Sequence, residues 1–114
     1  MASDIGLGPI SVNFADSEVV FRYTDPGAMT LEIPAHLDKK LRETMAAHDA
    51  DVAEKPILVD LEGILALSSR QLGILLLIRT VCGMSRPVIL RGISDPVESL
   101  LEVTKLTKLF QRES

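Results

Sequence analysis

The chain of 114 residues has no tryptophan, one tyrosine and three phenylalanines, so aromatic residues make up only 4% of it. Its core must therefore be built from aliphatic side chains, which suits helices packed on a sheet better than an aromatic binding platform. The lone cysteine, Cys82, excludes an internal disulfide and fits a reducing compartment. At this length we expect one domain.

Long apolar runs are absent as well. The longest unbroken run is Ile74–Ile78, whereas a membrane-spanning helix needs about 20 predominantly apolar residues. The beginning of the chain carries neither the basic nor the apolar segment of a secretory signal. We therefore expect a cytoplasmic protein without membrane insertion.

Positive charge is in short supply. Twelve Lys and Arg residues stand against sixteen Asp and Glu residues, which gives a net charge of −4. The basic residues are also scattered along the chain rather than clustered. Because direct nucleic-acid binding normally needs a basic patch or stripe, we expect no nucleic-acid partner.

The first part of the chain has the pattern of a hairpin. Residues 1–9 are small or glycine-rich and are expected to form a loose arm, with the domain itself spanning residues 10–114. Alternating apolar residues predict strands at Ile10–Phe14 and Val19–Tyr23. The connection between them is short, so the pair should be antiparallel.

A turn is predicted at Thr24–Gly27, and a helix follows it further on. Residues 28–33 fit either a third strand or an irregular lead into that helix. Pro34 suits the first turn of a helix, where its missing N–H is not needed. Three apolar residues at helical spacing should face the core: Leu37, Leu41 and Met45.

The chain is organised around Pro56–Ile78, a predicted buried strand, a short loop and a strongly apolar helix. The apolar run between Pro56 and Gly63 is typical of a strand covered on both faces. Ser68 is a good N-cap, and Gln71 three residues later completes a capping box. Further residues recur at helical intervals: Leu72, Leu75, Leu76, Arg79 and Cys82.

The last part of the chain repeats the order of strand and helix. The central helix should stop near Gly83, and Pro87–Ile93 is a second buried strand. Asp95 can cap the next helix, with Pro96 at its first position. The expected inner face consists of Val97, Leu100, Leu101, Thr104 and Leu106. Strands joined through helices are parallel neighbours, so the fold class is α/β with a mixed, mostly parallel sheet and an N-terminal hairpin.

Two segments resemble the STAS domain family. Residues Asp60–Gly73 (DLEGILALSSRQLG) are similar, without a gap, to the family's Asp-Leu-Ser-Gly-Val and Asp-Ser-Ser-Gly-Leu-Gly signature. Residues Leu90–Phe110 resemble its Leu-x-Gly-Ile-Ser-Pro-type turn and the leucine-rich helix that ends in Leu-Phe. The positions that match in the first segment are Asp60, Leu61, Gly63, Ser69, Leu72 and Gly73.

The resemblance implies a protein-binding regulatory domain. The best-known members are anti-sigma factor antagonists, which bind a GHKL-type Ser/Thr kinase that doubles as an anti-sigma factor. The kinase phosphorylates a serine at the start of the central helix and so breaks the complex, and a phosphatase restores it. Carried over, that serine is Ser69, with Ser68 as the second candidate. Residues implied in partner binding are Ser68, Ser69, Arg70, Gln71, Gly63, Ser94 and Asp95.

This sequence departs from the signature at three positions. Ser68, Arg70 and Gln71 stand where the family has an acidic residue, a small residue and a glycine. A phosphate adds about −1.5 to −2 charges, and a helix N-terminus tolerates it within the domain. The disruption would then be felt at the partner surface.

Other kinds of site have less support from the residues. His36 and His48 have no third ligand in sight, so we expect no metal and no cofactor. Neither histidine is placed to activate a serine, so we expect no enzyme activity. Asp60 resembles a phospho-acceptor aspartate, but no acidic pair follows the first strand as it does in response-regulator receivers.

A second hypothesis therefore stays beside the partner switch. STAS-like domains also serve as constitutive subunits of transporter complexes or signalling scaffolds, without phosphorylation. The departures at Ser68 and Gln71 favour this reading. Whether the chain forms a homodimer is also left open by the sequence.

Overall fold

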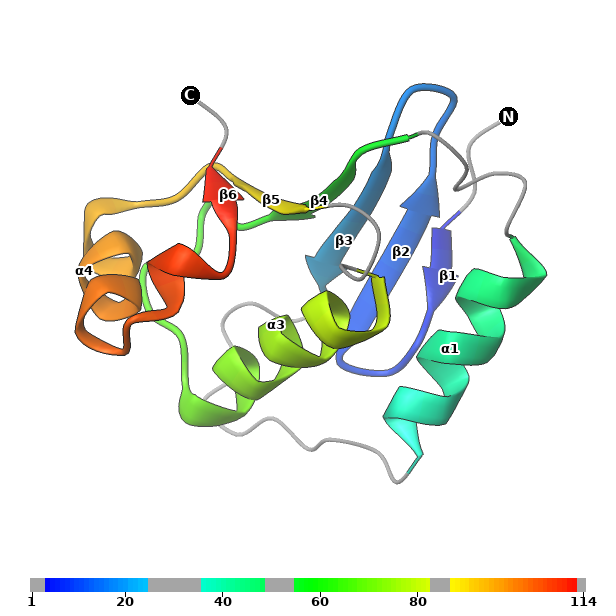
Figure 1. Ribbon diagram of the computed structural model, residues 1–114, viewed down its shortest axis with the longest axis horizontal. Helices are drawn as coiled ribbons and strands as arrows, with labels where there is room; N and C mark the ends of the chain where they lie inside the picture. The colour runs from blue at the N-terminus through cyan, green and yellow to red at the C-terminus, as the bar shows by residue number, and fades with distance from the viewer. Residues whose placement is uncertain (1–3, 25–35, 49–54, 83–86, 113–114) are drawn as a thin grey trace.

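The computed structural model describes residues 4–24, 36–48, 55–82 and 87–112. They form one mixed sheet with helices packed against it (Figure 1). The strands are β1 (Asp4–Gly6), β2 (Ile10–Phe14), β3 (Val19–Tyr23), β4 (Ile57–Asp60), β5 (Val88–Arg91) and β6 (Gln111–Arg112). The helices are α1 (Leu37–Ala47), α3 (Ser69–Cys82) and α4 (Asp95–Val103), with a short 3-10 helix, η1 (Leu106–Lys108).

The six strands lie side by side in the order in which they occur along the chain. Strand β2 is antiparallel to both of its neighbours, β1 and β3, whereas β3, β4, β5 and β6 run parallel to one another. The predicted hairpin is confirmed with its bounds, because Ile10 pairs with Tyr23 and Phe14 with Val19. The α/β fold class with a mixed sheet is likewise confirmed.

The loose arm predicted over residues 1–9 is wrong for the part that the structure describes. Asp4–Gly6 form strand β1 and pair with β2, and the Asn13 side-chain amide donates to Asp4 over 2.9 Å. Gly8, with φ +88°, turns the chain back toward β2. Leu7 is buried in the core. Two apolar residues among glycines gave too little alternation to reveal a strand.

The main core lies between one face of the sheet and the helices, with α1 and α3 running across that face (Figure 1). Every second residue of the central strands points into it, among them Val19, Phe21 and Tyr23 on β3. On α1, Leu37 and Leu41 are buried and Met45 packs against the core, as the spacing predicts.

The buried side of α3 follows the residues that recur at helical intervals only in part. Leu75 is buried, and Leu72 and Cys82 pack against the core, whereas Leu76 and Arg79 are exposed. The buried residues of this helix are Gln71, Ile74, Leu75 and Ile78. Because the helix is apolar almost all round, spacing alone could not select the face that packs on the sheet.

The opposite face of the sheet carries an ion-pair network. Arg91 contacts Glu18 over 3.1 Å and Asp60 over 3.7 Å, and Arg22 donates to Asp60 over 3.1 Å. Glu18 lies just before β3, and Asp60 is the last residue of β4. Because Arg91 contacts both, its side chain lies over the apolar residues between them. Two residues of that row, Val20 and Leu58, are buried.

Helix α4 begins one residue earlier than predicted. Ser94, not Asp95, is the N-cap, and its hydroxyl accepts from the Val97 N–H over 3.4 Å. Asp95 and Pro96 therefore open the helix itself. Val97 and Leu101 are buried on the inner face, and Leu100 packs against the core beside them. The helix ends before Thr104 and Leu106, although Leu106 also packs against the core. Four predictions fall outside the described residues wholly or in part: the turn after Thr24, the third strand at 28–33, Pro34 and the stop at Gly83.

Candidate functional site

The N-terminus of α3 is closed by the predicted capping box. The Gln71 N–H donates to the Ser68 hydroxyl over 3.2 Å, and the Ser68 N–H donates to the Gln71 side-chain oxygen over 2.7 Å. Two of the N–H groups that a helix end leaves without partners are thereby satisfied. Ser68 and Gln71 thus have a structural role, as the sequence indicates.

Gln71 is the residue that ties this helix end to the sheet. Its side chain is buried, and the Tyr23 hydroxyl at the end of β3 donates to its backbone oxygen. The side-chain nitrogen of Gln71 is buried without a hydrogen-bond partner among the described residues. The capping bond requires the side-chain oxygen to face Ser68, which turns this amide nitrogen inward.

Ser69 has a different position from its neighbour. It is the first residue of α3, is exposed, and takes no part in the capping box. Arg70 follows it and is exposed too. The two serines are therefore not equivalent: one caps the helix, and the other presents its hydroxyl at the positive end of the helix dipole.

The loop after β4 and the turn after β5 lie against each other beside this helix end. The Ser94 hydroxyl donates to the Ile64 carbonyl over 2.9 Å, and the Leu61 N–H donates to the Arg91 carbonyl over 2.8 Å. Gly92 packs so closely that an added Cβ would lie 2.9 Å from the backbone of Glu62. The fold thus brings together the loop that holds Gly63 and the turn that holds Ser94 and Asp95, residues that the resemblance implies in partner binding.

Gly63 and Leu65 shape the exposed part of that loop. Gly63 has φ +84°, a conformation that favours glycine, which explains this position of the motif. Leu65 is 68% exposed, an unusual state for a large apolar side chain beside a polar helix end. Sequence reasoning missed Leu65 because its neighbours Ile64 and Leu67 are buried and the run looks uniformly apolar.

Asp60 holds the start of this loop. One carboxylate oxygen accepts from the Glu62 N–H over 3.0 Å, and the other faces Arg22 and Arg91. The side chain is only 15% exposed. The aspartate of the motif therefore acts as an anchor between β4, its two neighbouring strands and the loop.

The histidines lie on α1, away from this helix end. His36 is exposed and forms the N-cap of α1 with φ +67°. The His48 ring stacks on Phe14 at 4.3 Å, and its Nδ1 lies 3.0 Å from the Thr44 carbonyl oxygen. In the described ranges, no three His, Cys, Asp or Glu residues are grouped so that they could hold a metal ion.

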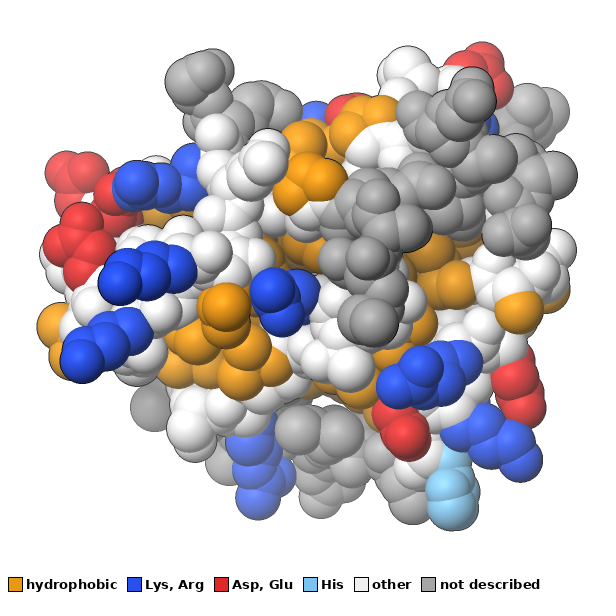
Figure 2. Space-filling model, viewed as in Figure 1, with side chains coloured by type: hydrophobic (Ala, Val, Ile, Leu, Met, Phe, Trp, Pro, Cys, Tyr) orange, Lys and Arg blue, Asp and Glu red, His pale blue; other side chains and the backbone are white. Residues whose placement is uncertain are grey.

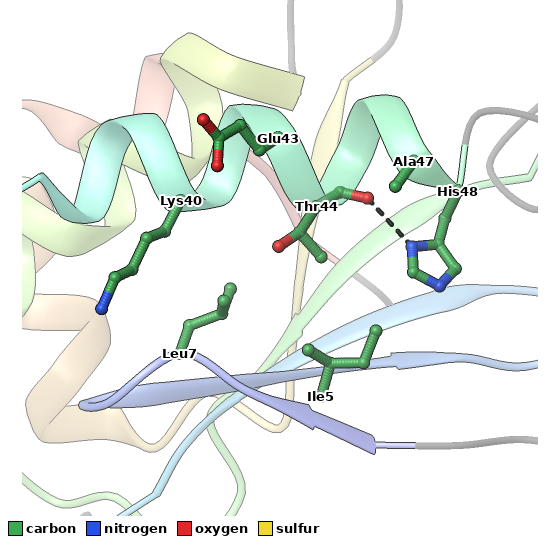
Figure 3. A pocket seen from close by; sticks show the side chains of 7 residues that line it. All are labelled: Ile5, Leu7, Lys40, Glu43, Thr44, Ala47 and His48. Carbon is green, nitrogen blue, oxygen red and sulfur yellow. Dashed lines mark hydrogen bonds between the residues drawn. The ribbon is translucent and has the colours of Figure 1, made fainter.

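A shallow groove of about 330 Å³ opens between β1 and α1 (Figure 3). Ile5 and Leu7 form its floor, and Lys40 and Glu43 stand on the helix side. None of the residues that resemble the STAS signature lines it. The sequence does not predict this groove, because its pattern indicates a loose arm over residues 1–9, where β1 forms the floor of the groove.

The described molecule is a small α/β domain whose polar helix end is bordered by two interlocked loops. A scan of protein-family models matches none to this chain, and no curated protein matches it. Within the described residues, none of the helices has the length and apolar character needed to cross a membrane.

The capping box gives a first prediction. Ser68→Ala should lower the free energy of unfolding by about 1 kcal/mol, because Gln71 loses the acceptor for its backbone N–H. Ser69→Ala is the matched control and should change it by less than about 0.5 kcal/mol. Urea unfolding monitored by circular dichroism measures both. Equal effects of the two substitutions would contradict the separate roles of the serines.

Tyr23 predicts a dependence on alkaline pH. Burial raises the pKa of Tyr23 well above that of an unfolded tyrosine, because the phenolate is poorly solvated there. The folded state therefore holds this proton more tightly. Stability from this residue is complete below a pH of about 10 and declines above it. Tyr23→Phe should remove that part of the decline.

Tyr23 is the single tyrosine and the chain has no tryptophan, so phenolate absorbance reports on this residue alone. The absorbance should rise together with the loss of helical circular dichroism as the pH increases. A phenolate signal that appears while the fold is still intact would show that Tyr23 is accessible and contradict the prediction.

Proposed function

We propose that this domain is an anti-sigma factor antagonist, a protein-binding regulator that works by partner switching rather than by catalysis. The partner is an anti-sigma factor of the GHKL-type Ser/Thr kinase class, and a phosphatase reverses the modification. The observation that carries the proposal is the exposed Ser69 at the first position of α3. Its neighbour Ser68 uses its hydroxyl in the capping box, whereas Ser69 does not.

The local geometry supports a switch that leaves the domain folded. The helix is capped by Ser68 and Gln71, so its start does not depend on the Ser69 hydroxyl. A phosphate on Ser69 would meet the positive end of the dipole and the nearby Arg70 cation, both of which favour an anion. The added charge and bulk would then act on whatever protein covers this end of the helix.

The partner surface in this proposal extends over the two interlocked loops. Gly63 and Leu65 lie on the exposed side of the first loop, and Asp95 is exposed at the start of α4. The position of the two loops relative to each other is fixed by the contact of Gly92 with Glu62 and by the hydrogen bond from the Ser94 hydroxyl to the Ile64 carbonyl. A partner that binds here would meet a preformed surface.

The second candidate is a constitutive subunit of a transporter complex or a signalling scaffold. One observation favours it: Gln71 is buried and completes the cap at the position where the STAS signature has glycine. A helix end that is already closed in this way also suits a permanent interface.

The experiment that separates the two uses a cognate GHKL-type kinase. Incubation with ATP should place a single phosphate on Ser69, detected by mass spectrometry. Ser69→Asp should weaken kinase binding about tenfold, equivalent to 1.4 kcal/mol, while Ser69→Ala should bind normally. Ser99→Asp, at an exposed serine of α4, is the control for added charge.

The partner switch is wrong if Ser69 carries no phosphate and Ser69→Asp binds the kinase as the parent protein does. Stable co-purification with a membrane ATPase or a large assembly, unchanged in Ser69→Asp, would support the constitutive subunit instead.

A further inference from the structure

The outward side of α3 is apolar as well as its buried side. Leu76 and Arg79 are exposed on this side, Leu76 to 36%, and the half-buried Leu72 lies one turn before Leu76 and also packs against the core. Arg79 donates through Nε to the Leu109 carbonyl over 2.9 Å, which brings the residue after η1 against the helix. Leu109 is also 36% exposed. Figure 2 shows an apolar patch over this part of the molecule, with Lys and Arg side chains around it.

The charge of the same region is one-sided. Residues 64–82 include Arg70 and Arg79 but no Asp or Glu, and residues 103–112 include Lys105, Lys108 and Arg112 but no Asp or Glu. Arg112 is paired with Glu98 on α4. The whole chain has a net charge of −4, so this concentration of cations runs against its average. Arg79 and Lys108, which are far apart in the sequence, both lie beside Leu109 in the fold.

Gly73 lies on this outward side, and no contact among the described residues of the domain requires a glycine at this position. An added Cβ would meet no atom within 4 Å, and the residue does not adopt a positive φ. A glycine inside a helix costs about 0.5–1 kcal/mol relative to alanine. An exposed glycine between Leu72 and Leu76 allows another backbone to approach the helix closely.

We infer that this region, the α3 outer surface, is a docking surface for an acidic amphipathic helix of a partner protein. It consists of Leu72, Gly73, Leu76, Arg79, Lys108 and Leu109. The partner helix would place aliphatic side chains on Leu76 and Leu109 and pack its backbone over Gly73. Its Asp and Glu residues would face the cations of α3 and η1.

Two other kinds of partner fit the surface less well. A membrane surface is bound by large apolar side chains that project fully into it, whereas Leu76 and Leu109 are each 36% exposed. Nucleic acid favours aromatic or purely basic surfaces, and this one has a purely aliphatic centre. An acidic amphipathic helix can contact both the aliphatic centre of the surface and the cations beside it.

Ser69 begins the same helix, three residues before Leu72, so a partner helix on this surface would end near the proposed phosphorylation site. The inference therefore deepens the proposed function, and it rests on that function only in assigning both sites to one partner.

The test is a selection from a displayed library of random peptides about 15 residues long, roughly four helical turns, on the intact protein. Enriched peptides should carry aliphatic residues at helical spacing, flanked by Asp and Glu. Their affinity should fall at least about tenfold in Gly73→Leu and in Lys108→Glu, and it should weaken as salt is added. Ala46→Leu and Lys39→Glu, exposed positions on α1, are the matched controls and should bind normally.

The inference is overturned if no peptide is enriched, if the enriched peptides lack acidic residues, or if Gly73→Leu and Lys108→Glu bind them as tightly as the controls. It is also overturned if vesicles of anionic phospholipid or duplex DNA bind this surface and the peptides do not. The selection involves no kinase, so acidic helical peptides together with an unphosphorylated Ser69 would refute the switch and leave the docking surface standing.

Discussion

Gly92→Ala is expected to lower the free energy of unfolding by about 2–4 kcal/mol, the largest change predicted for a single residue of the site. Two costs add up at this position. Gly92 has φ +72°, where a residue with a Cβ is strained, and the new carbon would lie 2.9 Å from Glu62 backbone atoms. Those atoms cannot move away easily, because the loop of Glu62 is bonded to Asp60 and Ser94 on either side.

Gly73→Ala is the matched control, since it makes the same chemical change on a helix. Nothing lies within 4 Å of the added carbon, so the free energy of unfolding should rise by about 0.5–1 kcal/mol. Chemical denaturation of the two variants measures both values. If Gly92→Ala proves as stable as the parent protein, the contact between the two loops is not as tight as described.

Asp60→Ala is expected to cost about 2–3 kcal/mol. The change removes the acceptor of the Glu62 N–H and leaves Arg22 and Arg91 without their shared carboxylate. Arg22 is about half exposed and can turn to water, whereas Arg91 is only 25% exposed and would stay beside Glu18. The loss should therefore come mainly from the loop N–H and from Arg91.

Asp16→Ala is the control for the loss of a carboxylate, because Asp16 is exposed in the hairpin turn; it should change stability by less than about 0.5 kcal/mol. In a double-mutant cycle, Arg22→Ala should cost less in the Asp60→Ala background than in the parent protein. Strictly additive effects would show that the Arg22–Asp60 pair contributes nothing.

The sequence was most informative where a pattern depends on neighbouring residues. The hairpin of β2 and β3 follows from alternation and a short turn, and the cap at Ser68 follows from the spacing of Ser68 and Gln71. Both are local effects, governed by backbone geometry and a few hydrogen bonds. The class of the fold then follows from the order of strands and helices.

Features that depend on packing could not be predicted in the same way. The outward position of Leu76 reflects which side of an apolar helix meets the sheet, and the burial of Gln71 reflects its contact with Tyr23 from β3. The approach of Gly92 to Glu62 joins residues 30 positions apart. Strand β6 at Gln111–Arg112 has no pattern of its own and is defined by pairing with β5.

The candidate site was predicted in part. The sequence indicated that Ser68 caps the helix and that Ser69 does not, and the hydrogen bonds agree. The exposed Leu65 and the cations around Leu76 and Leu109 were missed, because exposure and the gathering of charge from separate segments are properties of the folded surface.

The agreement between strand order and chain order bears on how this protein forms during synthesis. Each described strand pairs with the strand made just before it, so the sheet can grow from β1 to β6 as the chain leaves the ribosome. Among the described strands, no pairing has to wait for a strand from the far end of the chain, which favours rapid folding. The edge strand of the growing sheet is exposed only until the next strand pairs with it. This limits the time in which the sheets of two nascent chains could pair edge to edge.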